Sequence, residues 1–377
     1  MAGPYWQAAA GVMMMRAARP IFALSLALLA VSGVLAGLVR IGVAWASTLV
    51  VGWSQWHGVL MAACLMGAVI SLERAVAFKR RVGFVAPLAA LCAGLLLLAG
   101  ALPLYAALLL MLAALMLTWV SFCLWRRQPS FSGALLALAP LFWLLGTITW
   151  QSAQNPGAGV LSWLLFLVLT IAAERLELSR YQPTSPRARQ GFIVIMLLLL
   201  VSRLGWLSPE VAGRLYGWAL VGLALWLLRH DVARRTWRMG GATRYIANCL
   251  LAGYVWLLFA GGLGAMGAFD AGAVMFDAAL HAITLGFVFS MIFGHALIVL
   301  PAVSGLRVTY HPALYLAWLG LHCSLALRVY ADFCEQSRVW ALAGQLNALT
   351  LLLFMGSLLL VTRKARRPAR AVSKQRG

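Results

Sequence analysis

Long apolar runs alternate with short polar segments along nearly the whole chain. Each run approaches the roughly 20 residues that an α-helix needs to cross the hydrocarbon layer of a membrane. The pattern therefore predicts an all-α membrane protein with about twelve transmembrane helices. We place them at residues 20–38, 55–77, 82–100, 102–125, 132–150, 158–178, 190–207, 211–229, 245–266, 276–300, 312–331 and 338–361.

The composition agrees with this pattern. Hydrophobic residues make up 63% of the 377 residues and charged residues only 10%, and the mean hydropathy is +0.91. An ordinary soluble domain is far more polar. No polar linker or water-soluble module interrupts the apolar runs, so we expect a single polytopic membrane domain over residues 1–377.

The basic residues predict an orientation, because Lys and Arg accumulate in cytoplasmic loops. Placing both termini in the cytoplasm leaves residues 1–19 as a cytoplasmic N-terminal segment and residues 362–377 as a basic cytoplasmic tail. Only five basic residues then lie outside, namely Arg40, Arg203, Arg214, Arg328 and Arg338. The sequence VAWAS at 43–47 offers a second interpretation of the N-terminus as a cleaved signal peptide, but the long apolar run favours a retained anchor.

The formal net charge of +21 raises the question of nucleic-acid binding. These charges are spread over loops and one tail, without a soluble domain to carry them. Anionic lipid headgroups account for them better, so we expect membrane lipid and no nucleic acid as a partner.

Two short stretches indicate an internal repeat. AVISLERAVAFKRR ends the second predicted span and LTIAAERLELSRYQ ends the sixth, which places Glu73–Arg74 and Glu174–Arg175 at matching helix ends. One more step of four spans leads to the tenth. Three pseudo-equivalent sets of four helices would explain this spacing. The alternative is that charged residues merely decorate helix ends near the inner surface.

The chain has six histidines, and a titratable side chain inside hydrocarbon by default indicates a functional site. His57, in WSQWHGVLM, and His281 lie near the starts of the second and tenth spans. Since alternate spans run in opposite directions, both helices start on the outer side, and the two rings lie at similar depth. We therefore predict that His57 and His281 bind one metal ion or haem iron between them.

Three further histidines are candidate cofactor ligands. Fourteen residues separate His281 from His295, which on an α-helix is about 21 Å and returns nearly to the same face. This is the spacing of stacked haem sites in a helical bundle. The loop PAVSGLRVTYH brings His311 towards His295, and His322 is a candidate for the outer group. The alternative is that each ring only forms hydrogen bonds between helices.

DAALHAITLGFVFSMIFGHA, residues 277–296, resembles the signature helix of NnrS-type proteins, integral haem- and copper-associated proteins of bacteria linked to nitric oxide metabolism and nitrosative stress. WHGVLMAACLMGAVISLERAVAF and LRVTYHPALYLAWLGLHCSLALRVYAD extend the resemblance, which also includes haem-copper oxidase subunit I. The resemblance implies haem, with copper as a second cofactor, and His57 and His281 as ligands. It also implies the bacterial cytoplasmic membrane, and nitric oxide or an electron-transfer protein as partner.

One departure from subunit I limits the activity. Its copper site needs histidines on the sixth and seventh helices, and neither GVLSWLLFLVLTIAAERLEL nor GFIVIMLLLLVSRLGWL contains one. We therefore do not expect a standard oxygen-reducing oxidase, and we assign no catalytic residue. Arg40 and Arg328 are candidate partners for haem propionates.

Two other classes of protein fit the same pattern. Twelve helices with internal repeats also occur in secondary transporters, where the histidines with Glu73, Glu174 or Asp277 would relay protons. A subunit with an assembly or scaffolding role would use its histidines only for packing.

Overall fold

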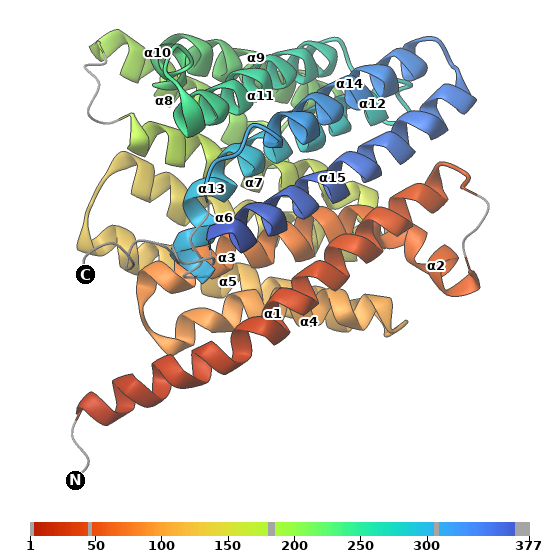
Figure 1. The fold of residues 1–377 in the computed structure, drawn as a ribbon. Coiled ribbons are helices and arrows are strands. Elements are labelled where there is room, and N and C mark those ends of the chain that lie inside the picture. Colours follow the sequence, from red (N-terminus) through yellow and green to blue (C-terminus); the bar gives the residue numbers. More distant parts are fainter. Residues whose placement is uncertain (1–3, 44–46, 180–184, 305–308, 366–377) are drawn as a thin grey trace, which may run out of the picture. The chain divides into compact units, whose positions relative to one another are not determined.

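The computed structural model describes residues 4–43, 47–179, 185–304 and 309–365. Within these ranges every regular element is a helix (Figure 1). Eleven helical segments there are long and apolar enough to cross a membrane, judged by length and composition. The prediction of an all-α, many-helix membrane protein is confirmed.

The chain forms two compact units, Met1–Glu177 and Leu178–Gly377, and each is described by itself. The division falls after the sixth membrane-spanning segment, so it does not follow the proposed sets of four. Both the three-set repeat and the single membrane domain stay predictions.

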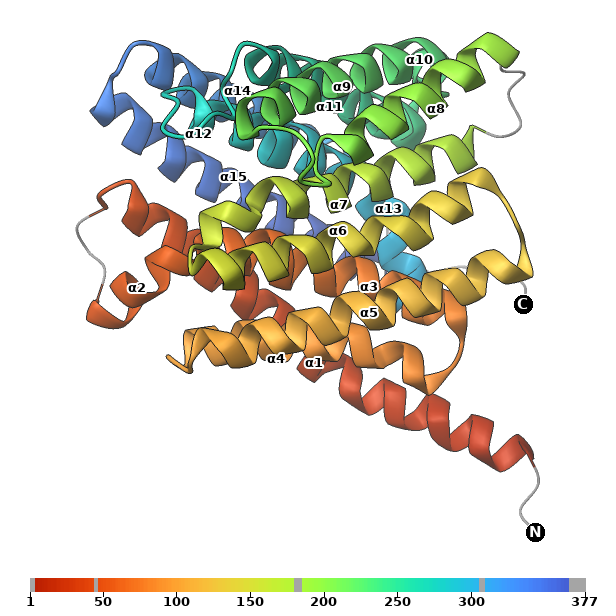
Figure 2. The same ribbon diagram turned by 180° about the vertical axis from the view of Figure 1, so that it is seen from behind.

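The first unit consists of helices with short connections. Its elements are α1 (Pro4–Arg40), α2 (Thr48–Trp53), the 3₁₀ turn η1 (Ser54–Trp56), the π-helix η2 (Val59–Leu65), α3 (Met66–Phe78), the 3₁₀ turn η3 (Arg81–Phe84), α4 (Val85–Leu98), α5 (Pro103–Arg127), α6 (Phe131–Ala153) and α7 (Pro156–Leu178). The π-helix η2 packs against both α1 and α4, and α5 lies between α4 and α6 (Figure 2).

Aromatic rings join α6 to α7. The rings of Trp143 and Phe166 stack with centroids 5.3 Å apart, and both side chains are fully buried. The indole N–H of Trp163 donates a hydrogen bond to the Thr147 hydroxyl at 3.3 Å. A buried indole usually needs such a partner, so this contact fixes how α7 is rotated against α6.

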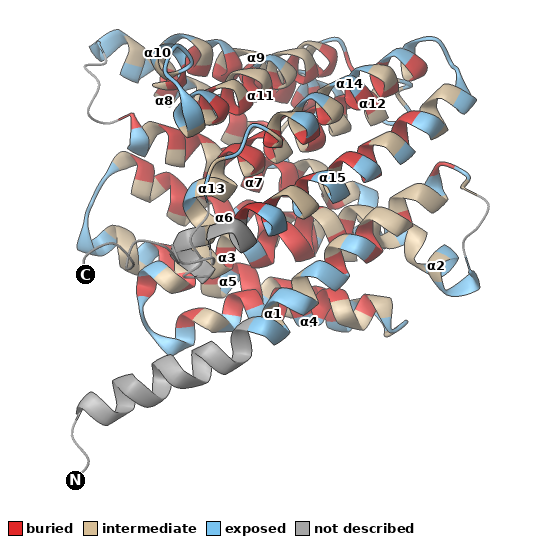
Figure 3. Cartoon of the chain, in the orientation of Figure 1, coloured by how far each residue is buried: buried red, intermediate tan, exposed pale blue. Residues whose placement is uncertain are grey.

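The second unit is organised around α11. Its elements are α8 (Pro186–Val201), α9 (Pro209–His230), α10 (Ala233–Thr236), α11 (Gly241–Ala265), α12 (Phe276–His281), the π-helix η4 (Ala282–Phe289), α13 (Ser290–Ser304), α14 (Leu314–Phe333) and α15 (Ser337–Ala365). Helix α11 packs against α9, η4 and α13, and α14 pairs with α15. Along α9 and α11, buried positions alternate with exposed ones, as expected of helices with one face in a core (Figure 3).

Glycines allow α9 and α11 to approach closely. A Cβ atom at Gly217 would overlap the backbone of Gly264 and Ala265, and one at Gly261 would lie 2.7 Å from the backbone nitrogen of Val221. Small residues at such positions let the backbones of membrane helices come into contact.

The sequence predicts about twelve membrane crossings, whereas eleven segments of the described chain are long and apolar enough. The difference lies at one helix. The predicted span at 190–207 corresponds to α8, which has only 16 residues and ends at Val201. At about 1.5 Å per residue, α8 is roughly 24 Å long, shorter than the hydrocarbon layer. The chain then turns through Gly205, at φ 79°, and Pro209 opens α9. The apolar residues after Val201 extended the predicted span without forming helix.

Three sequence predictions fall on residues outside the described ranges. These are the middle of the VAWAS segment, Arg307 in the loop before His311, and residues 366–377 of the basic tail.

Candidate functional site

His57 belongs to a continuous helical stretch formed by α2, η1, η2 and α3. Its Nδ1 atom lies 2.7 Å from the backbone carbonyl oxygen of Gly33 on α1. Because a carbonyl oxygen only accepts, Nδ1 carries the proton and the lone pair of the neutral ring is on Nε2. A metal-binding histidine commonly has this state, with one ring nitrogen donating to a carbonyl group and the other facing the metal.

Two glycines on α1 allow the helical stretch that carries His57 to pack closely, Gly37 against the His57 ring and Gly33 against Met61. A Cβ atom at Gly37 would lie 2.7 Å from Cε1 of His57, and a Cβ atom at Gly33 would lie 2.5 Å from the sulfur of Met61. Gly33 and Gly37 form a GxxxG pattern, which typically marks close packing between membrane helices. The role of these glycines was not predicted, although the GxxxG pattern in the sequence indicates it.

His281 ends α12 and has the same protonation pattern. Its Nδ1 atom lies 2.9 Å from the carbonyl oxygen of Asp277 and 3.3 Å from the carboxylate oxygen Oδ1 of the same residue. Both contacts require Nδ1 to donate, which again leaves the lone pair on Nε2. A carboxylate behind an imidazole fixes the tautomer and increases the basicity of the ligating nitrogen.

Asp277 is itself held by residues of α14 and α15. Arg328 contacts it with two nitrogens, Nε to Oδ2 at 2.8 Å and Nη2 to Oδ1 at 3.2 Å. The indole N–H of Trp340 donates to Oδ2 at 3.3 Å, and the guanidinium group lies 5.0 Å from the Trp340 ring centre. Arg328 was predicted to contact a haem propionate. In the structure its partner is the Asp277 carboxylate, and a propionate would have to bind beside this group or replace it. No motif in the sequence indicates this role for Trp340.

Both histidines lead directly into π-helix. Only Gly58 separates His57 from η2, and His281 immediately precedes η4. Six of the seven residues of η2 and six of the eight of η4 are buried, so the unusual backbone lies inside the core rather than at a frayed end. Short π-helical segments are rare and occur frequently at functional sites. This shared arrangement singles out His57 and His281 among the histidines.

His295 lies on α13, where its Nδ1 atom is 3.2 Å from the carbonyl oxygen of Met291. The prediction that His295 and His281 share one helix face assumed α-helical geometry between them. Residues 282–289 are π-helical instead, and each turn of a π-helix takes more residues. The shared face therefore no longer follows from the spacing.

His311 and His322 have different surroundings. His311 is exposed, and its Nδ1 atom accepts the backbone N–H of Ala313 at 3.2 Å just before α14. His322 lies on α14, and its Nδ1 atom accepts the indole N–H of Trp256 at 2.9 Å. An indole only donates, so the neutral His322 ring carries its proton on Nε2, unlike His57 and His281.

The two Glu-Arg pairs of the proposed repeat meet within the first unit. Nη2 of Arg74 on α3 lies 3.3 Å from Oε1 of Glu174 on α7. The side chains are only 18% and 21% exposed. Each Glu-Arg pair thus contributes one member to an ion pair between helices, and the matching positions in the sequence correspond to a contact in space.

His57 belongs to the first unit and His281 to the second, so their pairing at one metal ion stays a prediction. Within the described ranges, no three His, Cys, Asp or Glu side chains gather in a group that could hold a metal ion. Haem, however, is bound through as few as one or two axial ligands. The protonation state of both rings fits such a ligand.

The fold defines an all-α protein with many membrane-spanning helices. The chain belongs to the family described as "Domain of unknown function (DUF8744)", whose model matches residues 19–363. No curated protein and no solved structure matches the chain.

Proposed function

We propose that this protein is a haem-binding protein of the bacterial cytoplasmic membrane, with copper as a second cofactor. By its resemblance to NnrS-type proteins, we further propose a role in nitric oxide metabolism or in the response to nitrosative stress. The single observation that carries the haem proposal is the matched pair of histidines. His57 and His281 each donate from Nδ1 to a carbonyl group and each precede a buried π-helix.

The residues around the two rings determine what they offer to a cofactor. The Gly33 carbonyl and the Asp277 side chain each hold one imidazole in the tautomer with its lone pair on Nε2. Arg328 holds the Asp277 carboxylate in place with two hydrogen bonds, which opposes its turning away from His281. Bound haem would supply an iron ion that exchanges one electron and binds diatomic gases.

The test is the absorption spectrum and haem content of protein purified from haem-replete cells, compared between His57→Ala, His281→Ala and His230→Ala. His230 is a matched control, because its Nδ1 atom also lies 3.0 Å from the carbonyl oxygen four residues earlier, but no π-helix follows it. We expect His57→Ala and His281→Ala to lose the Soret band while His230→Ala keeps it. A colourless, metal-free wild-type protein would overturn the proposal.

The size of the loss tests whether the two histidines share an iron. If they do, either substitution alone removes nearly all haem of that site. If each holds a separate haem, each substitution removes one share and the double variant removes both. Adding nitric oxide to the reduced protein should shift the Soret band if the iron has an open position, which tests the proposed role.

The rival proposal is a proton-coupled secondary transporter. Two of its three relay carboxylates have arginine partners, since Glu174 pairs with Arg74 and Asp277 with Arg328. Each of these carboxylates would have to leave its arginine partner before it could pass a proton on. We therefore rank transport second. Proton-coupled uptake into liposomes by haem-free protein would reverse the order.

A further inference from the structure

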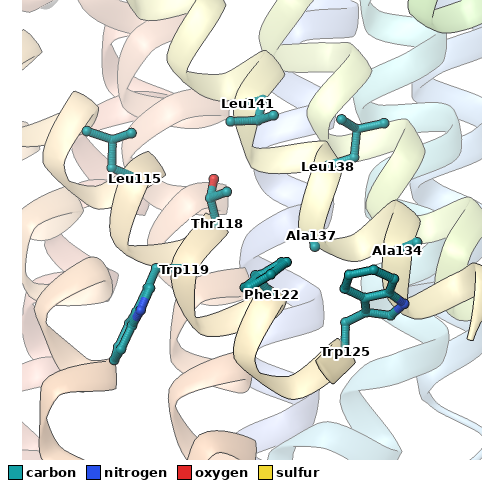
Figure 4. A pocket seen from close by; sticks show the side chains of 9 residues that line it. All are labelled: Leu115, Thr118, Trp119, Phe122, Trp125, Ala134, Ala137, Leu138 and Leu141. Carbon is teal, nitrogen blue, oxygen red and sulfur yellow. The ribbon is translucent and has the colours of Figure 1, made fainter. Parts of the chain in front are cut away.

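A groove runs between α5 and α6 of the first unit, within two of the membrane-spanning segments. Its volume is about 560 Å³, within the range of roughly 300–1,000 Å³ of small-molecule sites. Apolar side chains at helical spacing line both walls, and two alanines of α6 leave the space open (Figure 4). The lining residues are Leu115, Thr118, Trp119, Phe122, Trp125, Ala134, Ala137, Leu138 and Leu141.

The groove offers almost no polar contact along its length. The Thr118 hydroxyl donates to the Ala114 carbonyl of its own helix at 2.8 Å. The indole N–H of Trp125 donates to the Ser130 carbonyl in the α5–α6 connection at 3.1 Å, which anchors this ring at one end of the groove. An apolar, elongated ligand suits such a surface.

Arginines lie at that same end of the groove. The guanidinium carbon of Arg126 is 6.0 Å from the ring centre of Phe122, a groove residue. Arg80 and Arg127 lie 5.8 Å and 5.1 Å from the ring centre of Phe78. Because the arginines stack on aromatic faces, the N–H edges of their guanidinium groups remain available to a phosphate group.

Phe78 connects these charges to the groove wall. Its ring is buried, and it meets the groove residue Trp119 edge-on with centroids 5.4 Å apart. Arg80, Arg126 and Arg127 are exposed, and none of them has an acidic partner in the described part of the chain. An apolar groove thus ends at three unneutralised positive charges.

We propose that this groove binds an anionic phospholipid, with one acyl chain between α5 and α6 and the phosphate group at Arg80, Arg126 and Arg127. The apolar walls match the acyl chain, and the three charges match an anionic headgroup. A zwitterionic lipid would fill the groove equally well but would gain less from the arginines. The proposal does not depend on haem binding.

The test is native mass spectrometry of the full chain with an equimolar mixture of phosphatidylglycerol and phosphatidylcholine. We expect wild-type protein to retain phosphatidylglycerol in excess. Since each basic residue near an anionic surface contributes roughly fivefold, R80Q/R126Q/R127Q should lower that excess at least about tenfold. The matched control is R234Q/R235Q/R238Q, which removes three exposed arginines that line no part of the groove.

A second pair of variants tests the acyl-chain site without changing charge. Ala137→Phe fills the groove and should reduce retention of both lipids, while Leu108→Phe places the same ring on an exposed position of α5 outside the groove and should not. An equal loss in the control triple variant, or undiminished lipid in Ala137→Phe, would overturn the proposal. Displacement of the lipid by inorganic phosphate alone would also overturn it, because that result indicates a small-anion site.

Discussion

Arg328 on α14 contacts Asp277 on α12 through two hydrogen bonds, at 2.8 Å and 3.2 Å. The arginine side chain is only 7% exposed. Because the same carboxylate reaches Nδ1 of His281, the orientation of a candidate metal ligand depends on an ion pair with a neighbouring helix. A change to this ion pair should therefore affect both the stability of the second unit and the proposed cofactor binding at His281.

Asp277→Asn should destabilise the protein while preserving the shape of the side chain. It leaves Arg328 charged and nearly buried without its ion-pair partner. Fully buried pairs lose roughly 3–5 kcal/mol in this way, and we expect about 2 kcal/mol because Asp277 is 34% exposed. Thermal unfolding in detergent measures the effect.

The control for Asp277→Asn is Arg214→Gln. Arg214 lies 3.8 Å from Asp270, and its side chain is 59% exposed, so its loss should cost less than about 1 kcal/mol. Comparable losses in the two variants would show that the Asp277–Arg328 pair has no special role.

Gly37→Ala should displace His57 without removing it. The added Cβ atom would lie 2.7 Å from Cε1 and 2.9 Å from Nδ1 of the ring, which forces the ring or α1 to move. We expect a lower haem content or a shifted Soret band, in a protein that still purifies as a single species. The control is Gly262→Ala on α11, where an added Cβ meets no atom within 4 Å. Unchanged spectra in Gly37→Ala would indicate that His57 does not bind the cofactor.

The sequence predicts the coarse architecture because hydrophobic length alone distinguishes a membrane helix from a soluble one. It fails at α8, where apolar residues continue past the end of the helix at Val201. Hydropathy records the polarity of a segment but not where its backbone stops being helical. The turn at Gly205 and the start of α9 at Pro209 decide that point.

The candidate site is predictable only in part. Histidines in apolar runs stand out in any sequence, and Asp277 with His281 has the four-residue spacing of neighbours on a helix. The π-helices after His57 and His281 have no comparable signal, because i→i+5 bonding arises from packing around the segment. Gly286 in η4, for example, faces Trp256 of α11, and a Cβ atom there would lie 2.5 Å from the Trp256 side chain.

The ion pair between Arg74 and Glu174 should couple α3 to α7 measurably. We expect Arg74→Gln and Glu174→Gln each to lower the free energy of unfolding, and the double variant to lose less than the sum. A coupling energy of about 1 kcal/mol is reasonable for a pair that is one-fifth exposed. Glu73→Gln is the control, because Glu73 is a like charge close to Glu174, so its neutralisation should not destabilise the protein. Strict additivity of the two losses would contradict a direct interaction.

Substitution of His322 should leave the haem content unchanged, in contrast to substitution of His57 or His281. Its Nδ1 atom accepts a hydrogen bond from Trp256, and its Nε2 atom is buried with no hydrogen-bond partner in the described part of the chain. In the neutral ring Nε2 then carries the proton, so neither nitrogen offers a lone pair to iron.

His322→Phe should therefore keep the haem content of the wild-type protein, while His281→Ala loses it. Phenylalanine preserves an aromatic ring against Trp318, whose ring centre lies 4.9 Å from that of His322, so packing changes little. The absorption spectrum per mole of protein measures the outcome. A loss of the Soret band in His322→Phe as large as in His281→Ala would show that His322 binds the iron, which requires Trp256 to give up its hydrogen bond when haem enters.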